Sequence, residues 1–580
     1  MKDEILKFFK GDVEDNEETL TKYSRDASIF EMRPQLVLFP KDSTDIQNLV
    51  KWVDENRLKF RDLSITMRAA GTCMSGGAIN DSLIVDVTRY MNKIIEVKKT
   101  PEEKIQPKFP GSREVTAEGE ATVEPGCFYR DFEVETLKQD LILPCYTASK
   151  SLNAIGGMVG NNSGGEKTLS YGKTEDYVKQ LKIILSDGKE CVVKPITKNE
   201  LDVKMMQEDQ EGKMYRMVWN IIQRNREEIR EAKPKVSKNS AGYNIWNVWD
   251  STEPIGTVTD KTLFDLSQLI IGSQGTLGLV TEITLRLVKV KKVSKLFAIF
   301  LKDLTPLGNL VDEILKHGPE SIESYDDKTL KLAVRFFPDF LKKKGVGGMF
   351  KFMMSFLPEF WMMVTGGFPK LVLLVEFTGD IEEEVNQKML KLDESLKVFK
   401  IKTHITQSTE EAEKYWDIRR ESFSLLRKHI KNKHTAPFID DVIVMSEFLP
   451  TFLPEISKIL SEYPIEFTIA GHAANGNFHI IPLMDFNDPK TVGIILELSD
   501  KVYDLVLKYH GSIDAEHNDG IIRTPYLKKM YGEKIYSIFE EIKKVFDPYN
   551  IFNPGKKVGA IQGDIQKYII KSDPTAKHSS

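Results

Sequence analysis

Two histidines, His472 and His479, have the spacing of a pair that could bind one metal ion. They lie in the segment Ile465 to Leu483, IEFTIAGHAANGNFHIIPL, where strand-like apolar residues flank Asn475-Gly476. Asn-Gly is the strongest short-range signal for a two-residue hairpin turn. Such a turn pairs His472 with His479 and puts both imidazoles on one face, with Cβ atoms about 5 Å apart. The alternative is two histidines that only pack on a sheet face.

A third metal ligand is available further along the chain. The stretch Gly511 to Gly520, GSIDAEHNDG, supplies Glu516 and His517 in a composition typical of a loop. Two histidines plus one carboxylate, with open positions, form a catalytic rather than a structural metal set. The sequence therefore predicts His472, His479 and Glu516 as metal ligands.

Composition describes a large protein with few thiols. The 580 residues are 41% hydrophobic and 29% charged, with a net charge of −5, so we expect about two to four globular domains and no nucleic-acid partner. The cysteines, none in a CxxC pair, favour a reducing compartment and disfavour an iron–sulfur cluster. The acidic start without an apolar stretch predicts no secretory signal, and the cytoplasm is the expected location. The cysteines are Cys73, Cys127, Cys145 and Cys191.

Strand-like and helix-like runs alternate irregularly, which predicts an α+β fold. The basic stretch from Val288 to Lys295 marks a domain boundary, and residues after Pro554-Gly555 lose apolar periodicity, as a tail does. Strands are expected at Leu83–Val87, Ala121–Val123, Leu181–Leu185, Leu279–Leu287 and Lys370–Phe377, and helices at Thr44–Asn56, Tyr129–Gln139, Asp380–Ser395 and Glu410–Lys428.

The segment 336–374 is rich in Phe, Met and Trp but is interrupted by Lys351, Pro358-Glu359 and Lys370. No stretch reaches the roughly 20 apolar residues that a spanning helix needs. Three interpretations remain: a buried flap, a patch that lies on the inner face of a membrane and reaches a quinone, and a surface that docks a partner.

Three glycine clusters in the first half predict close approach of the backbone to a large polar ligand. Glycine permits positive φ and lets N–H groups reach a phosphate, although each cluster alone could be an ordinary turn and none has the Walker or GxGxxG pattern. The clusters are MRAAGTCMSGGAI (Met67–Ile79), IGGMVGNNSGGEKTLSYG (Ile155–Gly172) and IGSQGTLGLVTE (Ile271–Glu282).

Taken in order, these motifs resemble those of the vanillyl-alcohol oxidase/PCMH flavoproteins, in the branch of D-lactate dehydrogenase, glycolate oxidase subunit and D-2-hydroxyglutarate dehydrogenase. The resemblance extends from Arg33-Pro34 to DPYNIFNPGK at Asp547–Lys556, and includes ATVEPG (Ala121–Gly126), GHAANGNFH and AEHNDG. It implies a bipartite PCMH-type FAD-binding domain and a ferredoxin-like α/β substrate (cap) domain, with the C-terminal segment returning to the first.

The expected division is an N-terminal extension over 1–32, the FAD-binding domain over 33–290, the substrate domain over 291–545 with the apolar insertion 336–374, a C-terminal segment over 546–558 that packs on the FAD domain, and a tail over 559–580.

The resemblance also implies roles for individual residues. Arg68 to Gly77 matches a pyrophosphate-binding loop, Gly156 to Gly165 a loop around the flavin, and Ser273 to Gly278 the start of a strand that lines the cofactor. For single members of these loops, plain turn chemistry is the alternative. The expected FAD-binding residues are Arg68, Ala70, Gly71, Thr72, Cys73, Ser75, Gly76, Gly156, Gly157, Gly160, Asn161, Asn162, Ser163, Gly164, Gly165, Gly172, Gly275, Gly278 and Val280.

Catalytic roles follow in the same way. His472, His479 and Glu516 match the family's divalent-metal ligands, and His517 matches its general base. Arg419 matches an arginine that binds the substrate carboxylate, although a solvated helix charge is the alternative because Arg420 adjoins it. The metal could be zinc, manganese or iron.

Several positions depart from the family pattern. Asn475 stands where the family usually has Asp, which puts the metal affinity in doubt, and Gln274 replaces a usual Glu. No histidine lies in the first loop, so non-covalent FAD is expected, although Cys73 is a thiol there. The lysine that hydroxyglutarate-type members place before their DL/DV strand is absent from PFIDDVIV (Pro437–Val444).

The expected function is metal-assisted, FAD-dependent oxidation of a small D-2-hydroxy acid, D-lactate-like, to the 2-oxo acid. Electrons would pass to a quinone or an electron-transfer protein. One alternative is an FAD transferase like alkylglycerone-phosphate synthase, which the lack of a histidine run at AEHNDG disfavours. Another is a flavoprotein subunit of a larger electron-transfer complex.

Overall fold

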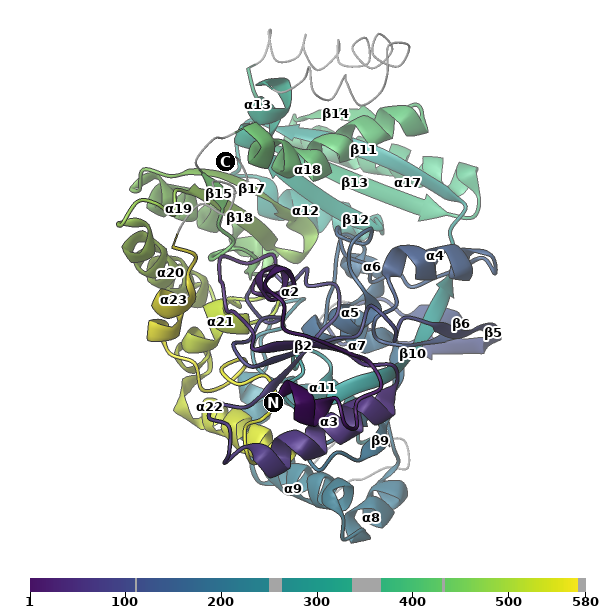
Figure 1. Ribbon diagram of the computed structural model, residues 1–580. Helices are drawn as coiled ribbons and strands as arrows, with labels where there is room; N and C mark the ends of the chain where they lie inside the picture. Colours follow the sequence, from purple (N-terminus) through teal and green to yellow (C-terminus); the bar gives the residue numbers. More distant parts are fainter. Residues whose placement is uncertain (110–111, 250–262, 336–366, 430–432, 572–580) are drawn as a thin grey trace. The chain divides into compact units, whose positions relative to one another are not determined.

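The computed structural model describes residues 1–109, 112–249, 263–335, 367–429 and 433–571 (Figure 1). The chain divides into two compact units. The first unit comprises 1–165, 171–290 and 513–570, and the second comprises 166–170, 291–512 and 571–580. The boundary at 290/291 lies inside the basic stretch that the sequence indicates.

The first unit begins with a small sheet of order β1-β2-β4-β3. Its strands are β1 (Asp12–Glu14), β2 (Leu36–Phe39), β3 (Ile65–Arg68) and β4 (Leu83–Asp86), and β4 pairs in parallel with both β2 and β3. Helix α3 (Ser43–Asn56) starts where the Asp42 side chain accepts hydrogen bonds from two backbone N–H groups. Its buried residues Ile46, Leu49, Val50 and Val53 recur at helical spacing and form one apolar face.

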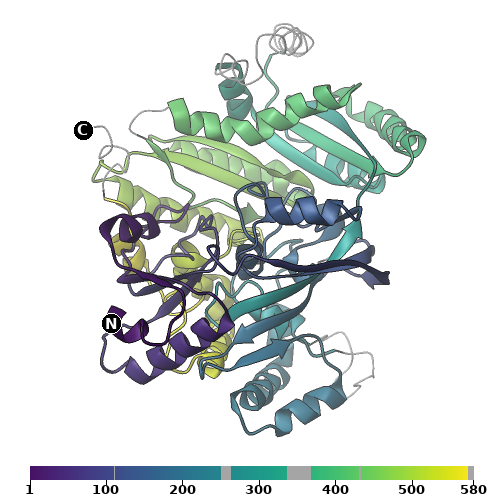
Figure 2. The same ribbon diagram turned by 45° about the vertical axis from the view of Figure 1, so that its right-hand side comes forward.

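A larger antiparallel sheet follows, with the order β5-β6-β10-β8-β9 and the short β7 (Leu141–Ile142) beside β10. β6 (Val115–Val123) alternates buried and half-buried residues, as a strand with one face on the core does. Figure 2 shows the long β5–β6 hairpin, and away from it the helices α8 (Lys198–Met206) and α9 (Gln210–Arg224), which pack on each other. The other strands are β5 (Ile94–Ile105), β8 (Val178–Ile184), β9 (Glu190–Val193) and β10 (Leu279–Lys289).

Short helices complete the first unit. They are α1 (Lys2–Ile5), α2 (Glu17–Tyr23), α4 (Tyr129–Leu137), α5 (Ile155–Asn161), α6 (Thr168–Tyr171, shared with the second unit), α7 (Thr174–Tyr177), α10 (Arg226–Ala232) and α11 (Ser267–Ile270).

The C-terminal segment joins the first unit at residue 513, earlier than the expected 546. It contains α21 (Gly520–Arg523), α22 (Leu527–Phe546) and α23 (Gln562–Tyr568), so residues 559–570, expected to be a tail, include a helix. The N-terminal 32 residues are likewise part of this unit, because β1 pairs with β2. The sequence did not predict these contacts, because both segments are short and polar and show no apolar periodicity.

The second unit is built on a ferredoxin-like core, as the resemblance implies. β11 (Val293–Leu301), α12 (Leu307–Lys316), β12 (Ser321–Asp326), β13 (Leu371–Gly379), α17 (Glu382–Leu396) and β14 (Lys402–Ile405) follow one another along the chain. Their strands lie in the order β14-β11-β13-β12, which is that of two split βαβ units. β13 is buried on both faces, which explains its continuous apolar sequence LVLLVEF.

The sheet continues from β12 into β17 (Glu466–His472), β18 (Asn477–Met484) and β15 (His434–Thr435), with β16 (Val442–Ile443) also on β18. Helix α18 (Thr409–His429) packs on one face through Tyr415 and Ile418, and α13 (Asp327–Arg335) packs beside it. α17 contacts β11 and β13, and α12 contacts α17 and α19 (Leu449–Ser461), which packs on α20 (Thr491–Lys508).

Of the segment 336–374, residues 336–366 lie outside the described part of the chain. Residues from Leu371 onward form β13 in the sheet core. Among the described residues, no helix has the length and apolar character needed to span a bilayer. The strands and helices expected at the other positions are present, with ends that differ by a few residues.

The hairpin that carries the histidines differs from its prediction. A 3₁₀ turn at Ala473–Asn475 and Gly476 in the left-handed region connect the strands, so His472 pairs with Asn477 and His479 with Ala470. The predicted pairing of His472 with His479 is therefore wrong by two residues. Because side chains alternate with period two, this shift keeps both histidines on one face.

The conformation of Gly476 predicts a selective cost for Gly476→Ala. Its φ is 72°, and a Cβ would overlap the Val444 carbonyl oxygen. We expect this variant to lose about 2 kcal/mol or more of stability, from left-handed strain plus the clash. Urea unfolding measures it. The control Gly493→Ala lies in α20 with nothing within 4 Å of its added Cβ, and it should be neutral or stabilising by about 1 kcal/mol. Equal effects of both substitutions would contradict the turn geometry.

Candidate functional site

The first glycine cluster follows β3 in the first unit. Arg68, at the end of the strand, is 9% exposed and donates through Nη1 to the carbonyl of Ala78. Gly71 and Gly76 have positive φ values of 68° and 84°. Positive φ is the backbone conformation that glycine permits at low cost.

The second cluster is a helix followed by a turn rather than a loop throughout. α5 carries Gly156, Gly157 and Gly160, and ends where Asn162 adopts the left-handed conformation. Gly156 lies against the Pro125 carbonyl, which leaves no room for a side chain. A Cβ at Gly157 or Gly160, in contrast, would meet nothing closer than 3.8 Å. These two glycines are the ones whose backbone a ligand could approach.

Gln274, in the third cluster, ties the three clusters together. Its Nε2 lies 3.2 Å from Asn161 Oδ1 of the second cluster and 3.8 Å from Cys73 Sγ of the first. Its Oε1 accepts from the Gly520 N–H of the C-terminal segment at 2.9 Å. The family's usual Glu could accept at both oxygens but not donate, so the amide allows these three contacts at once.

The other predicted cofactor residues lie near these clusters in the chain. Gly275, with open space around it, has a φ of 70°, and Gly172, with a φ of 81°, directly precedes Lys173, the cap of α7. Ser273 to Gly278 is a turn, and the strand expected there starts at Leu279, so Val280 lies inside β10. Contact between any of these residues and a flavin stays a prediction.

Cys73 is a buried thiol. Burial raises the pKa of Cys73 above its ordinary value, so the thiol is protonated at neutral pH. Its Sγ lies 3.2 Å from Ser75 Oγ and accepts from the Gly77 N–H. A protonated, hydrogen-bonded thiol is a poor nucleophile, which agrees with non-covalent binding of a flavin.

The second unit brings His472 and His479 together. Their Nε2 atoms are 3.4 Å apart. The Nδ1 atom of His472 lies 2.5 Å from a Glu323 oxygen, and that of His479 lies 3.1 Å from an Asp440 oxygen. Since a carboxylate only accepts, each Nδ1 carries a proton, and in the neutral imidazole Nε2 then presents a lone pair.

Two lone pairs at this distance require a cation or a proton between them. Two ligands of a tetrahedral zinc ion, at about 2.0–2.1 Å from the metal, are about 3.3 Å apart. The separation of the two nitrogens therefore fits a shared metal ion, and the carboxylate behind each imidazole is the usual partner of a metal-bound histidine.

Glu323 and Asp440 were not expected from the sequence. Both are buried, with 2% and 0% of their surface exposed. Glu323 lies on β12, directly opposite His472 on β17. In the sequence, Glu323 stands between Ile322 and Ser324 and could equally face the solvent. Only the pairing of β12 with β17, which are distant in sequence, shows that Glu323 lies beside His472.

Arg419 points inward from α18. Its Nη2 lies 3.2 Å from Glu323 Oε2, and its side chain is 15% exposed. The adjacent Arg420, in contrast, is 48% exposed and pairs with Glu166. Of the two arginines, Arg419 is therefore the one beside the histidine cluster.

Glu516 and His517 lie in the first unit, on a loop held by buried amides. Asn518 donates through Nδ2 to the carbonyl of Gly272 at 2.8 Å, and its N–H donates to Asp514. Glu516 Oε2 forms an ion pair of 2.8 Å with Lys238, which is fully buried. Lys238 was also missed by the sequence analysis, because it lies 278 residues away in the chain.

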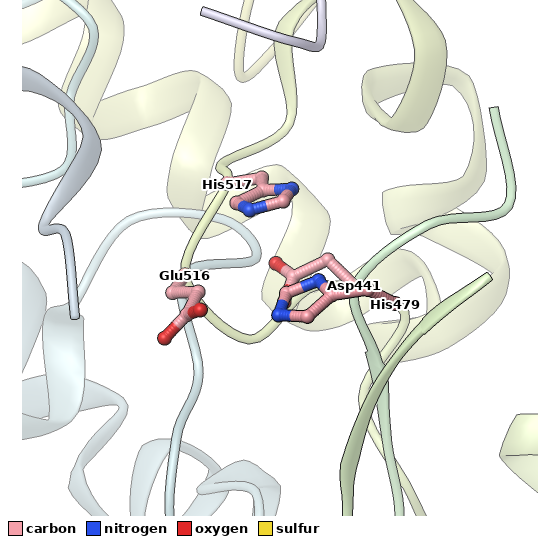
Figure 3. A group of neighbouring side chains, drawn as sticks. All are labelled: Asp441, His479, Glu516 and His517. Carbon is pink, nitrogen blue, oxygen red and sulfur yellow. The ribbon is translucent and has the colours of Figure 1, made fainter. Parts of the chain in front are cut away.

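Figure 3 shows the side chains of Glu516 and His517 of the first unit, and those of Asp441 and His479 of the second unit. Within each pair, the ligand atoms lie within 4.8 Å of each other. Asp441 is fully buried, has a φ of 66°, and accepts from Asn477 Nδ2. It is a further carboxylate in the second unit that the sequence did not single out.

The buried ion pair predicts a large effect of Lys238→Met. Removing one partner of such a pair leaves the Glu516 charge uncompensated, at a cost of about 3–5 kcal/mol. The measurement is the urea midpoint of the unfolding transition in the presence of chelator. The double variant Lys238→Met/Glu516→Leu should recover most of the loss. Lys98→Met, which breaks the exposed pair with Glu96, should cost less than about 1 kcal/mol. A Lys238→Met variant as stable as Lys98→Met would refute a buried pair.

Two family models match the chain. "FAD binding domain" matches residues 34–194, and "FAD linked oxidases, C-terminal domain" matches residues 290–557. The chain is 26% identical over 552 residues to D-2-hydroxyglutarate dehydrogenase of Pseudomonas putida, which covers 94% of this chain and 50% of that protein. It is 25% identical over 539 residues to glycolate oxidase subunit GlcD of Bacillus subtilis, with 92% and 91% covered.

The chain thus spans about half the length of several D-2-hydroxyglutarate dehydrogenases that it matches. Among solved structures, alkyldihydroxyacetonephosphate synthase is similar with a TM-score of 0.62 at 13% identity, covering 96% of this chain and 84% of that one. p-Cresol methylhydroxylase is similar with a TM-score of 0.61 at 14% identity, with 95% and 94% covered.

These structures share the fold, and the two matching domains follow each other along the chain. The chain therefore carries an FAD-binding domain followed by the C-terminal domain of FAD-linked oxidases, and its fold is similar to that of p-cresol methylhydroxylase.

Proposed function

We propose that this protein oxidises a small D-2-hydroxy acid to the 2-oxo acid, with FAD and a divalent metal ion. The observation that carries the proposal is the histidine pair: two Nε2 atoms 3.4 Å apart, each imidazole backed by a buried carboxylate, with an inward arginine beside them. Metal ligands and a carboxylate-binding cation together fit a substrate that has a hydroxyl and a carboxylate on neighbouring carbons.

The glycine clusters support FAD as the cofactor. Gly157, Gly160 and Gly275 have room where a side chain would stand, so their backbone can approach a ligand. Arg68, buried at the start of the first cluster, offers a cation to a pyrophosphate. The full set of loop residues expected from the family resemblance is proposed to hold the flavin.

The ligand set supports a divalent cation. We propose His472, His479 and Glu516 as ligands of the same ion, and two neutral imidazoles plus a carboxylate suit zinc, manganese or iron. Glu516 pairs with Lys238 through Oε2. Its other oxygen, Oε1, is proposed to bind the metal ion.

Arg419 and His517 have different roles in the proposed reaction. Arg419 binds the substrate carboxylate and so orients the α-carbon, and His517 accepts the proton of the α-hydroxyl. An FAD held by the glycine clusters would supply the hydride acceptor, and a divalent ion held by His472, His479 and Glu516 would lower the pKa of the α-hydroxyl. The substrate loses one proton and one hydride, and the product is the 2-oxo acid. The electrons then pass to a quinone or a protein acceptor.

The side chain of the substrate is proposed to be small, as in D-lactate. The segment Pro437–Val444 lacks the lysine expected for a second carboxylate. Relatives named D-lactate dehydrogenase, such as that of Anaerostipes hadrus, match 24% of 530 aligned residues. The transferase alternative shares the fold with alkyldihydroxyacetonephosphate synthase, but the chain has AEHNDG where the transferase has its histidine run.

Anaerobic reduction of the flavin tests this proposal. We expect D-lactate or another small D-2-hydroxy acid to bleach the flavin absorbance of the purified, FAD-loaded protein. Chelator should abolish bleaching, and added Zn²⁺, Mn²⁺ or Fe²⁺ should restore it. The L-enantiomers are the control. A loaded flavin that no D-acid bleaches would remove the 2-hydroxy-acid function and favour the transferase or the subunit.

The two adjacent arginines offer a matched pair of variants. Arg419→Lys keeps the charge but loses the planar fork, so kcat/KM should fall about 10- to 100-fold, mainly through KM. Arg420→Lys changes a solvent-exposed partner of Glu166 and should leave kcat/KM within about twofold. Steady-state kinetics with a dye acceptor measures both. An Arg420 effect as large as that of Arg419 would contradict the assignment.

A further inference from the structure

We infer that Glu323 is a positioning residue that couples the metal histidine to the substrate-binding arginine. The inference rests on the proposed function. One oxygen of Glu323 contacts His472 and the other contacts Arg419, so a single carboxylate holds two groups with different tasks.

The position of Glu323 is set by the sheet. β12 lies between β13 and β17, and Glu323 is the residue directly opposite His472. Directly opposed residues of antiparallel strands place their side chains on the same face, with Cβ atoms about 4.5–5.5 Å apart. Glu323 is 2% exposed, and its strand is hydrogen-bonded to a neighbouring strand on each side.

Toward His472, Glu323 selects the tautomer. Its Oε1 lies 2.5 Å from Nδ1, which must carry the proton because the carboxylate only accepts. The lone pair is thereby fixed on Nε2, the atom that faces His479 at 3.4 Å. Without this partner, the imidazole could carry its proton on Nε2 and lose its ability to bind a metal ion.

Toward Arg419, Glu323 provides the opposite charge. The guanidinium is largely withdrawn from water, with 15% of its side chain exposed, and Oε2 lies 3.2 Å from Nη2. A buried cation without a partner carries a desolvation cost. The contact with Glu323 uses only Nη2, which leaves the other guanidinium nitrogens to bind a carboxylate.

One substitution should therefore damage two functions together. Gln in place of Glu323 can accept at its oxygen but must donate at its nitrogen. If the nitrogen faces His472, it forces the wrong tautomer, and if it faces Arg419, two donors confront each other. Loss of a partner of this kind commonly costs 10- to 100-fold in metal affinity or activity.

The experiment compares Glu323→Gln, Glu323→Asp and Glu376→Gln in the FAD-loaded full chain. Glu376 is the matched control: it is a buried glutamate on the neighbouring strand β13, and it bonds to Ser294 and Ser321 rather than to the histidine or the arginine. Calorimetric titration with Mn²⁺ or Zn²⁺ gives the metal Kd, and steady-state kinetics at saturating metal gives KM and kcat. Thermal melting shows that each variant is folded.

We expect Glu323→Gln to weaken metal binding 10- to 100-fold and, at saturating metal, to raise KM for the hydroxy acid by at least fivefold. Glu376→Gln should change neither, and Glu323→Asp, which keeps the charge, should recover part of both. If Glu323→Gln has the same metal Kd and the same KM as Glu376→Gln, the inference is overturned. It is also overturned if Glu323→Gln loses metal affinity but keeps the wild-type KM. A wild-type protein that binds no metal or oxidises no hydroxy acid would instead refute the proposed function.

Discussion

A charged side chain that leaves water needs an opposite charge or several hydrogen bonds inside the protein, and this constraint organises both units. In the second unit, Arg419 and His472 share Glu323. In the first, Lys238 pairs with Glu516, and Lys557 pairs with Asp519, both of them fully buried. Because Glu323 and Lys238 pair with residues far away in the sequence, the charges that could do chemistry also fix the chain around them.

The C-terminal segment shows how this fixing works in the first unit. Asn553 donates to the carbonyls of Gly77 and Gln274, and Lys557 donates to Ser240. Side chains that donate to backbone carbonyls stabilise irregular loops, which lack the ladder of a helix or sheet. The first and third glycine clusters are thus tied to the C-terminal segment by hydrogen bonds from Asn553. The loop with Glu516 and His517 belongs to the same network through Asn518.

Sequence patterns predicted what depends on local periodicity and short motifs. The strands around Leu83 and Leu279, the helices around Thr44 and Glu410, and the common face of the two histidines all follow from spacing of this kind. The turn at Gly476 is longer than the predicted two-residue turn, because Asn-Gly occurs both in two-residue turns and at the end of longer ones. Glu323 and Lys238 were beyond reach, since their partners lie 149 and 278 residues away.

The same pairings bear on Asn475, where the family usually has an aspartate. Asn475 is 5% exposed, in the second unit, where Glu323, Asp440 and Asp441 already bury three carboxylates. A fourth negative charge would add to their repulsion and to the desolvation cost, which a neutral amide avoids. The carboxylates that contact His472 and His479 are Glu323 and Asp440. The proton on each Nδ1 is therefore held without an aspartate at position 475.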